Sequence, residues 1–243
     1  MEMMCGISSC AVRRKLRGFT LVEIAIVLLI TGLLVASVIQ GQQLIQGARV
    51  RSVIATQDAI ATAVLAFQDR FQALPGDYVQ AGIFIACTPA CPAGNGNGRI
   101  EDTGTPRESI LVWTHLANAG FLNGSFSATS ATSSVDAGNT PQNMVGGYLQ
   151  VAFDNSWGYS ANPVRRHNIK TGNNLPVEVM AEADRKADDG LPGSGRIQFS
   201  PYAASGDAPA WGGSATSCVT MDTTAAAWNI AGDQSNCGGA TLL

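Results

Sequence analysis

The sequence has little charge and almost no histidine. Charged residues make up 14% of the 243 residues, and His115 and His167 are the two histidines. The chain contains no HExxH, GxSxG or GxxxxGK[ST] pattern, so the usual signatures of metalloproteases, serine hydrolases and phosphate-binding loops are missing. Because catalysis needs a constellation of such groups, we expect a protein that is not an enzyme.

Positive charge is scarce beyond the first 18 residues. That segment holds four basic residues and one acid, whereas the remaining chain is acidic, and the net charge is −3. Because nucleic-acid binding relies on Lys and Arg to neutralise phosphates, no nucleic-acid partner is expected.

One long apolar run dominates the N-terminal region. Residues 19–39 contain a single charged residue, Glu23, and about 20 predominantly apolar residues suffice to cross a bilayer as a helix. The basic residues before the run predict that its N-terminal side stays cytoplasmic. The alternative is a conventional secretory signal peptide, which would give a secreted soluble protein with a mature N-terminus near Val38.

Helical spacing continues beyond the apolar run. Apolar residues recur every three, four or seven positions, at Val53, Ile60, Val64, Phe67, Phe71 and Leu74. Since Pro75-Gly76 would stop a helix, the pattern predicts one helix over about 19–74.

The rest of the chain has weaker signals. They predict helices over 108–119 (ended by Gly120) and 175–187 (with Asn174 as N-cap) and strands over 147–153 and 195–201. Residues 76–106, 123–143 and 206–243 are predicted to be loops. A small antiparallel sheet packed on the long helix makes an α+β fold.

The N-terminal stretch RGFTLVEIAIVLLITGLL resembles the class III signal of type IV pilins and type II secretion pseudopilins. The resemblance implies that a prepilin peptidase cleaves between Gly18 and Phe19, and that the new N-terminal Phe19 is methylated. It also implies that Glu23, the fifth residue of the mature chain, acts in assembly by pairing with the amine of a neighbouring Phe19. A carboxylate inside the bilayer costs a few kcal/mol without a partner; alternatively, Glu23 only reaches the headgroup boundary. The shorter stretches LPGDY, GNGNGRIED, ESILVWTHLANAGFLNG and DRKADDGLPGSGRIQ are similar to head motifs of a pilin-like subgroup.

The resemblance implies a pilin-like fold in three parts. These are a cleaved leader (1–18), a transmembrane and filament-core half-helix (19–45) and a periplasmic globular head (46–243). The chain would be a single-pass protein of the bacterial inner membrane before assembly, and part of a periplasmic pseudopilus or surface pilus afterwards. Implied partners are the prepilin peptidase, an inner-membrane assembly platform and other pilin subunits, in a homo- or hetero-filament. The alternative within the family is a minor or tip pilin that binds a surface, DNA or a secreted substrate.

Cysteines beyond the apolar run suggest an oxidising compartment. Cys87, Cys91, Cys218 and Cys237 allow three pairings, of which the sequence-local one, Cys87–Cys91 with Cys218–Cys237, is the simplest. Cys87 and Cys91 are separated by three residues and have no matching pair nearby, which disfavours a zinc site.

One glycine-rich stretch partly matches a calcium-binding loop. With Gly98 at position 6, positions 3, 5, 7 and 9 fall on Asn95, Asn97, the Arg99 carbonyl and Glu101. Ala93 and Gly104 occupy the end positions where acids are needed, so the full pattern fails unless another acid completes the site. Ca²⁺ is therefore the one candidate cofactor, and a glycine-rich turn is the alternative.

Two charged stretches remain. Asp184, Asp188 and Asp189 form either a second carboxylate cluster or a helix end that is capped by Gly190. The basic stretch RRHNIK (165–170) is predicted to be a solvated loop, with contact to DNA or to an acidic neighbour as alternatives.

Overall fold

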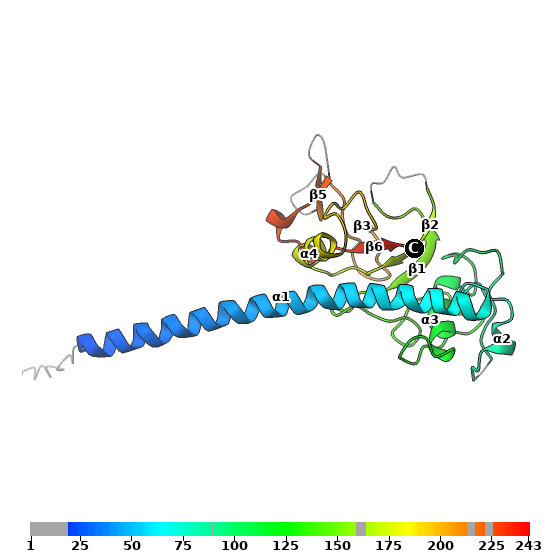
Figure 1. Ribbon diagram of the computed structural model, residues 1–243, viewed down its shortest axis with the longest axis horizontal. Helices are drawn as coiled ribbons and strands as arrows, with labels where there is room; N and C mark the ends of the chain where they lie inside the picture. The colour runs from blue at the N-terminus through cyan, green and yellow to red at the C-terminus, as the bar shows by residue number, and fades with distance from the viewer. Residues whose placement is uncertain (1–18, 89, 159–163, 213–216, 222–225) are drawn as a thin grey trace, which may run out of the picture. The chain divides into compact units, whose positions relative to one another are not determined.

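The computed structural model describes residues 19–88, 90–158, 164–212, 217–221 and 226–243. The chain divides into two units between Ile45 and Gln46. The elements, labelled in Figure 1, are α1 (Leu21–Phe71), α2 (Ala81–Phe84), α3 (Glu108–Asn118), β1 (Gln150–Asp154), β2 (Arg166–Lys170), α4 (Val177–Ala187), β3 (Ile197–Phe199), β4 (Val219–Met221), β5 (Ala226–Trp228), the 3-10 helix η1 (Ile230–Gly232) and β6 (Gly239–Leu242).

The N-terminal unit, over its described residues, is the first part of α1 and is apolar on all sides. Large side chains such as Leu21, Leu29 and Leu33 are exposed. An 18-residue stretch of this helix has a mean hydropathy of 2.7 and is long and apolar enough to cross a membrane. Gly32 and Gly41 do not interrupt it. The predicted long helix is confirmed.

The head contains a four-stranded antiparallel sheet in the order β1-β2-β6-β3. In its register, Val151 of β1 faces Ile169 of β2, and Thr241 of β6 faces Ile169 on one side and Ile197 on the other. Strands β4 and β5 form a separate antiparallel pair. The predicted α+β class with a small antiparallel sheet is confirmed.

The head's apolar side chains form two main clusters, and α1 contributes to both. Ile60, Val64 and Phe67 pack with Trp113 and Ile169. The second cluster, about two to three turns earlier on α1, joins Val50 and Val53 to Met180, Phe199 and Trp228. Full burial of such a side chain is worth about 1.5–3 kcal/mol, so this periodic face of α1 holds the head together.

The predicted helix over 108–119 is confirmed, including its end. After α3, Gly120 has a φ of +82°, which favours glycine. The Gly120 N–H donates to the Ala117 carbonyl, and the Phe121 N–H donates to the Leu116 carbonyl. These two bonds are a Schellman motif, and Phe121 and Leu116 supply its apolar contact.

Three predictions about local structure are wrong. The 206–243 segment is not a loop, because it contains β4, β5 and β6. The RRHNIK stretch is mostly β2, in which Asn168, Ile169 and Lys170 are buried. Asn174 does not cap α4: the N-cap is Pro176, and Asn174 has a φ of +66° in the preceding turn.

The remaining differences are smaller. The 76–106 loop includes the single-turn helix α2, and the two predicted strands shift to 150–154 and 197–199. These strands are set by pairing with distant partners rather than by their own alternation, which moves their ends by a few residues.

Candidate functional site

Thr20 and Glu23 cap the N-terminus of α1. The Thr20 backbone N–H and hydroxyl both donate to Glu23 Oε2 at 2.8 Å, and the Glu23 N–H donates to Thr20 Oγ1 at 3.2 Å. This reciprocal pair is a capping box, which satisfies amide groups that a helix leaves free at its start. The role of Thr20 was not predicted from the sequence, although the spacing Thr-x-x-Glu is the signal of a capping box.

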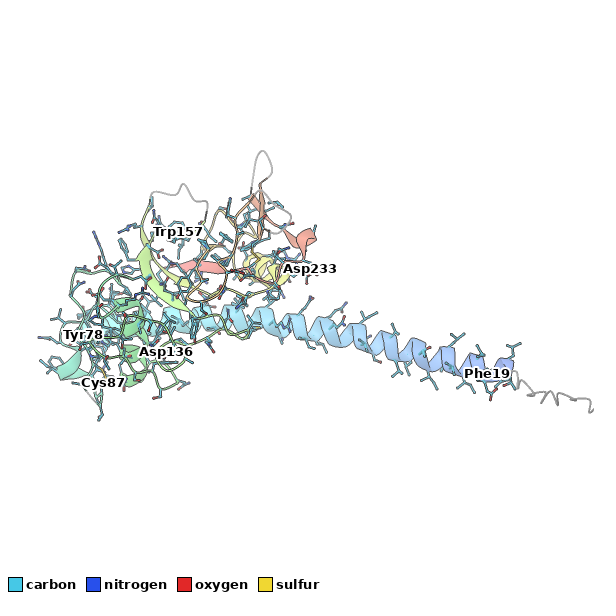
Figure 2. All side chains as sticks on the ribbon, turned by 180° about the vertical axis from the view of Figure 1, so that it is seen from behind. Phe19, Tyr78, Cys87, Asp136, Trp157 and Asp233 are labelled. Atoms are coloured by element: carbon cyan, nitrogen blue, oxygen red, sulfur yellow. A yellow bond between two sulfur atoms is a disulfide. The ribbon has the colours of Figure 1, made fainter. Side chains whose placement is uncertain are left out.

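Phe19 lies directly before this cap, and 82% of its surface is exposed. Figure 2 shows it at the start of the helical segment. Gly18, the residue on the other side of the predicted cleavage point, lies outside the described residues, as do the basic residues before it. Exposed Phe19 thus lies directly before the capping turn, four positions ahead of the Glu23 carboxylate.

A buried carboxylate organises the glycine-rich stretch of the head. Asp77, which is only 4% exposed, follows the end of α1. Its Oδ1 accepts hydrogen bonds from the N–H groups of Gly96 (2.6 Å) and Asn97 (3.0 Å), and its Oδ2 accepts one from Gly98 (2.8 Å). A charged acceptor with three backbone donors is a strong anchor, because charge-assisted hydrogen bonds are about twice as strong as neutral ones.

Glu108, at the start of α3, holds the same stretch from the other side. Its two carboxylate oxygens accept the N–H groups of Asn95 (2.9 Å) and Glu101 (3.0 Å). Burial raises the pKa of the Glu108 carboxyl above its usual value, against these two hydrogen bonds, and the charges of Asp77 and Glu101 raise it further. Two acids from separate elements therefore clamp one loop.

The residues predicted as calcium ligands lie within this clamped loop. Asn95 Oδ1 accepts the Asn97 N–H, Asn97 Oδ1 accepts the Arg99 N–H, and Glu101 Oε2 lies 3.4 Å from the Asn95 amide nitrogen. Asp77 also contacts this loop, but both of its carboxylate oxygens accept backbone N–H groups of the loop. Calcium binding by Asn95, Asn97, Arg99 and Glu101 stays a prediction.

A second acidic cluster could hold a metal ion. Carboxylate oxygens of Asp184, Asp188 and Asp189 lie within 4.8 Å of one another at the end of α4. They already accept protein hydrogen bonds: Asp184 from the Trp228 indole (2.8 Å) and Asp189 from Ser194 Oγ (2.7 Å). Asp188 Oδ2 accepts the backbone N–H groups that begin β3, which ties the helix end to the sheet.

His115 and Lys170 are buried groups that support the fold, and His167 is half-buried. His115 is fully buried, and burial lowers its pKa to about 4. Burial also lowers the pKa of His167, whose Nε2 accepts the Ile100 N–H at 3.2 Å. Lys170 forms an ion pair with Asp154 and donates to Gln150 Oε1 at 2.8 Å, while burial lowers its pKa.

The structure joins Cys87 to Cys91 and Cys218 to Cys237. This is the sequence-local pairing. The first disulfide follows α2, and the second links the residue just before β4 to the segment just before β6. Cys237 is fully buried and Cys218 is 1% exposed, so the second disulfide is part of the apolar core.

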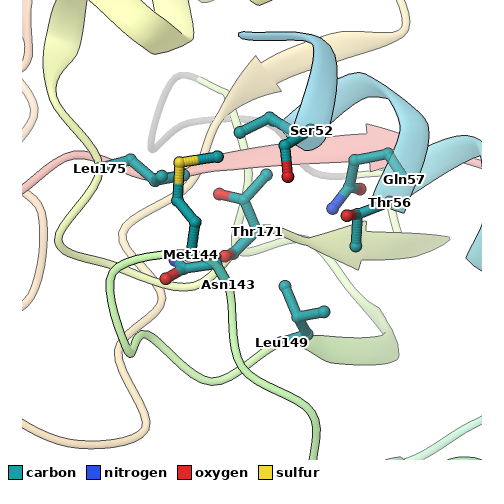
Figure 3. A pocket seen from close by; sticks show the side chains of 9 residues that line it. Ser52, Thr56, Gln57, Asn143, Met144, Leu149, Thr171 and Leu175 are labelled. Carbon is teal, nitrogen blue, oxygen red and sulfur yellow. Dashed lines mark hydrogen bonds between the residues drawn. The ribbon is translucent and has the colours of Figure 1, made fainter. Parts of the chain in front are cut away.

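Two hollows lie along the α1 segment of the head. The smaller, drawn in Figure 3, has a volume of about 20 Å³ and lies between Thr56, Gln57, Leu149 and Leu175. Gln57 Oε1 is buried there without a hydrogen-bond partner. A space of this size holds about one water molecule and no organic ligand. The larger hollow is an open groove of about 340 Å³ beside residues 52–60.

One part of the chain matches a known family model. Residues 13–39 match the family model of the prokaryotic N-terminal methylation motif. The match covers the basic residues, Gly18, Phe19, the capping box and the first part of the apolar helix. Among curated proteins and among solved structures, no match to the chain was found.

Proposed function

We propose that this chain, which carries the N-terminal methylation signal of type IV pilins and pseudopilins, is a non-catalytic structural subunit of a type IV pilus or a type II secretion pseudopilus. The observation that supports this most directly is that the matched motif runs without a break into α1, which continues into the head as far as Phe71. A conventional signal peptide is removed from the mature protein, so it is not expected to form one helix with the folded head.

The signal implies processing by prepilin peptidase and assembly with other pilins. We place cleavage between Gly18 and Phe19, followed by methylation of the Phe19 amine. The apolar helix and the signal are consistent with membrane anchoring. In the proposed topology the head is periplasmic, where an oxidising environment would favour its disulfides. An inner-membrane assembly platform would then transfer the subunit into the filament.

The capping box suggests how Glu23 serves both stages. In the single chain its carboxylate is satisfied by Thr20, which lowers the cost of holding a charge near lipid. On assembly, the methylated amine of a neighbouring Phe19 would be a second, oppositely charged partner. Glu23 would thus keep a hydrogen-bonded carboxylate in the membrane and gain an ion pair in the filament.

Mass spectrometry of the mature N-terminal peptide tests the proposal. The expected result is a chain that starts at N-methylated Phe19. A chain that starts beyond Ile39 would contradict it and would support a secreted protein. As a matched control, Gly18→Glu places a bulky charged side chain at the cleaved bond and should leave the leader attached, without changing a residue of the mature chain.

The minor or tip pilin remains the second candidate within this function. Its role would be binding by the head, and the exposed residues of the 123–145 segment are the surface available for it. Subunit stoichiometry in sheared filaments separates the two: a major subunit forms most of the mass, whereas a tip subunit is present at about one copy per filament.

A further inference from the structure

The head carries an open groove with apolar and small side chains. Ala55, Ala59 and Ile60 of α1 line it together with Leu122, Phe126 and Leu149. The other lining residues are Pro141 and the uncharged polar residues Ser52, Thr56, Asn123 and Gln142. Its volume of about 340 Å³ exceeds the roughly 150 Å³ that accepts a benzene ring in an engineered apolar cavity. The groove therefore has room for a large apolar side chain together with a second one.

The same head exposes an apolar knob, defined here as Val79, Ile83 and Phe84. Their exposed fractions are 55%, 77% and 59%. Buried residues on both sides fix the backbone, because Ala81 is fully buried and Ile85 is 4% exposed. The Cys87–Cys91 disulfide follows directly. The knob is thus a set of exposed apolar side chains on an anchored turn.

The knob and the groove lie on different parts of the head. Figure 1 shows α2, which carries Ile83 and Phe84 of the knob, at the C-terminal end of α1, whereas the groove runs beside residues 52–60 of that helix. A surface that fits another surface elsewhere on the same molecule makes a heterologous contact. Such contacts propagate from copy to copy into rings or filaments.

Charge favours contact between these two surfaces. The sequence has no Asp, Glu, Lys, Arg or His from Tyr78 to Gly98, a stretch that includes the knob. Among the described residues that line the groove, none is charged. Docking therefore buries no charged side chain, and so avoids a desolvation cost of several kcal/mol per charge. Each large apolar side chain that is buried gains about 1.5–3 kcal/mol.

We propose that the apolar knob of one copy docks into the groove of the next copy, as a head-to-head contact of the assembled filament. The contact staggers neighbouring subunits along α1, because the knob lies beyond the helix end and the groove lies partway along the helix. This inference rests on the proposed function, since it requires that the chain assembles with itself.

Cysteine cross-linking in the full-length chain, expressed in cells that assemble the filament, tests the contact. Ile83→Cys in the knob is combined with Ala59→Cys in the groove, and sheared filaments are treated with a mild oxidant. Non-reducing gels should show a ladder of linked subunits, at least about tenfold stronger than in either single variant. The matched control is Ile83→Cys with Ala227→Cys, an exposed residue of β5 that does not line the groove.

Several results would overturn the contact. The proposal is contradicted if filaments form without a ladder. It is also contradicted if the Ala227→Cys control gives an equal ladder, or if Ile83→Cys alone gives dimers. A ladder whose bands contain a different protein would show that the partner is not a second copy. If the unsubstituted chain has N-methylated Phe19 and forms filaments while the ladder fails, only this inference falls. If the unsubstituted chain is neither methylated nor assembled into filaments, the proposed function is contradicted, and with it this inference.

A second measurement does not depend on cross-linking. Phe84→Ser removes the largest side chain of the knob from a surface position and should lower filament yield at least about tenfold. The amount of processed subunit in the membrane and its urea unfolding midpoint should stay unchanged. Normal filament yield from Phe84→Ser would contradict docking.

Discussion

His115 accepts a hydrogen bond from the backbone N–H of Gly76 through Nδ1, at 2.9 Å. Its other ring nitrogen, Nε2, lies 2.8 Å from the Pro92 carbonyl and donates to it in this tautomer. One neutral imidazole on α3 therefore ties together the turn after α1 and the start of the glycine-rich stretch. The ring can do this only while it is uncharged.

The stability of the head should therefore fall in mild acid. Burial lowers the pKa of His115 to about 4 from an ordinary value of 6.5. Its contribution is fully present above pH 6.5 and is lost as the pH falls from 6.5 toward 4, by up to about 3 kcal/mol. Urea unfolding of the full chain in detergent at pH 7.5 and pH 4.5 measures this loss. His115→Gln should be less stable at pH 7.5 but should show a smaller difference between the two values. An unchanged pH dependence in that variant would contradict the assignment.

Asp184 should have the opposite pH dependence. Burial raises its pKa to about 6 from 3.8, and the nearby Asp188 and Asp189 add to the shift. A raised carboxyl pKa contributes stability below pH 3.8, and that contribution is lost as the pH rises through about 6. Asp184→Asn keeps an oxygen that can accept the Trp228 N–H and removes the charge. We expect the variant to be more stable than the unsubstituted chain at pH 8, with a smaller gain at pH 4.5.

Asp189→Asn is the control for that experiment, because Asp189 belongs to the same turn but is exposed. Its gain in stability at pH 8 should be smaller than that of Asp184→Asn, because it removes only one of the charges that raise the Asp184 pKa. Trp228 fluorescence during unfolding reports on the local contact. A gain for Asp184→Asn that did not depend on pH would argue against a buried, raised carboxyl.

Asp77→Ala should unfold or loosen the glycine-rich loop. The substitution removes a buried carboxylate that accepts three backbone N–H groups, and each hydrogen bond to a charged group contributes about 1.5–3 kcal/mol. We expect a loss of about 3 kcal/mol in urea unfolding and faster amide hydrogen exchange at Gly96, Asn97 and Gly98. Asp77→Asn retains one acceptor oxygen and should lose less. Equal losses for the two variants would mean that the hydrogen bonds are not the cause.

The two disulfides should differ in their contribution to stability. Cys218–Cys237 closes a loop with a sequence separation of 19 and Cys87–Cys91 one of 4. Chain entropy then predicts a loss of about 3 kcal/mol for the Cys218→Ser/Cys237→Ser variant and about 2 kcal/mol for the other pair. Thermal unfolding without reductant compares them. A larger loss for the Cys87→Ser/Cys91→Ser variant would contradict the ordering.

The long helix and the α3 end could be predicted because their signals are local. Helical spacing from Val53 to Phe71 and the stop at Pro75-Gly76 describe α1 to within three residues at its C-terminal end. Gly120 likewise marks the end of α3. A backbone with positive φ at a helix end favours glycine, and this preference does not depend on the path of the following chain.

The contacts that shape the head are not local and could not be predicted. Asp77 accepts hydrogen bonds from N–H groups that lie 19 to 21 positions later. The residues next to Asp77 in the sequence do not indicate these partners. Lys170 looked like part of a solvated basic stretch, yet Asp154 and Gln150 on the neighbouring strand give its charge partners inside the protein. Strand β6 consists of Gly, Ala, Thr and Leu, whose preference for a strand arises from its neighbours.

The position of β6 also sets an order of events during synthesis. It follows every other strand along the sequence, yet it lies between β2 and β3 in the sheet. As the chain emerges N-terminus first, β3 must therefore wait for Gly239–Leu242 before it can pair with β6. Until then the sheet remains open, so the head completes its fold only after these late residues have been synthesised.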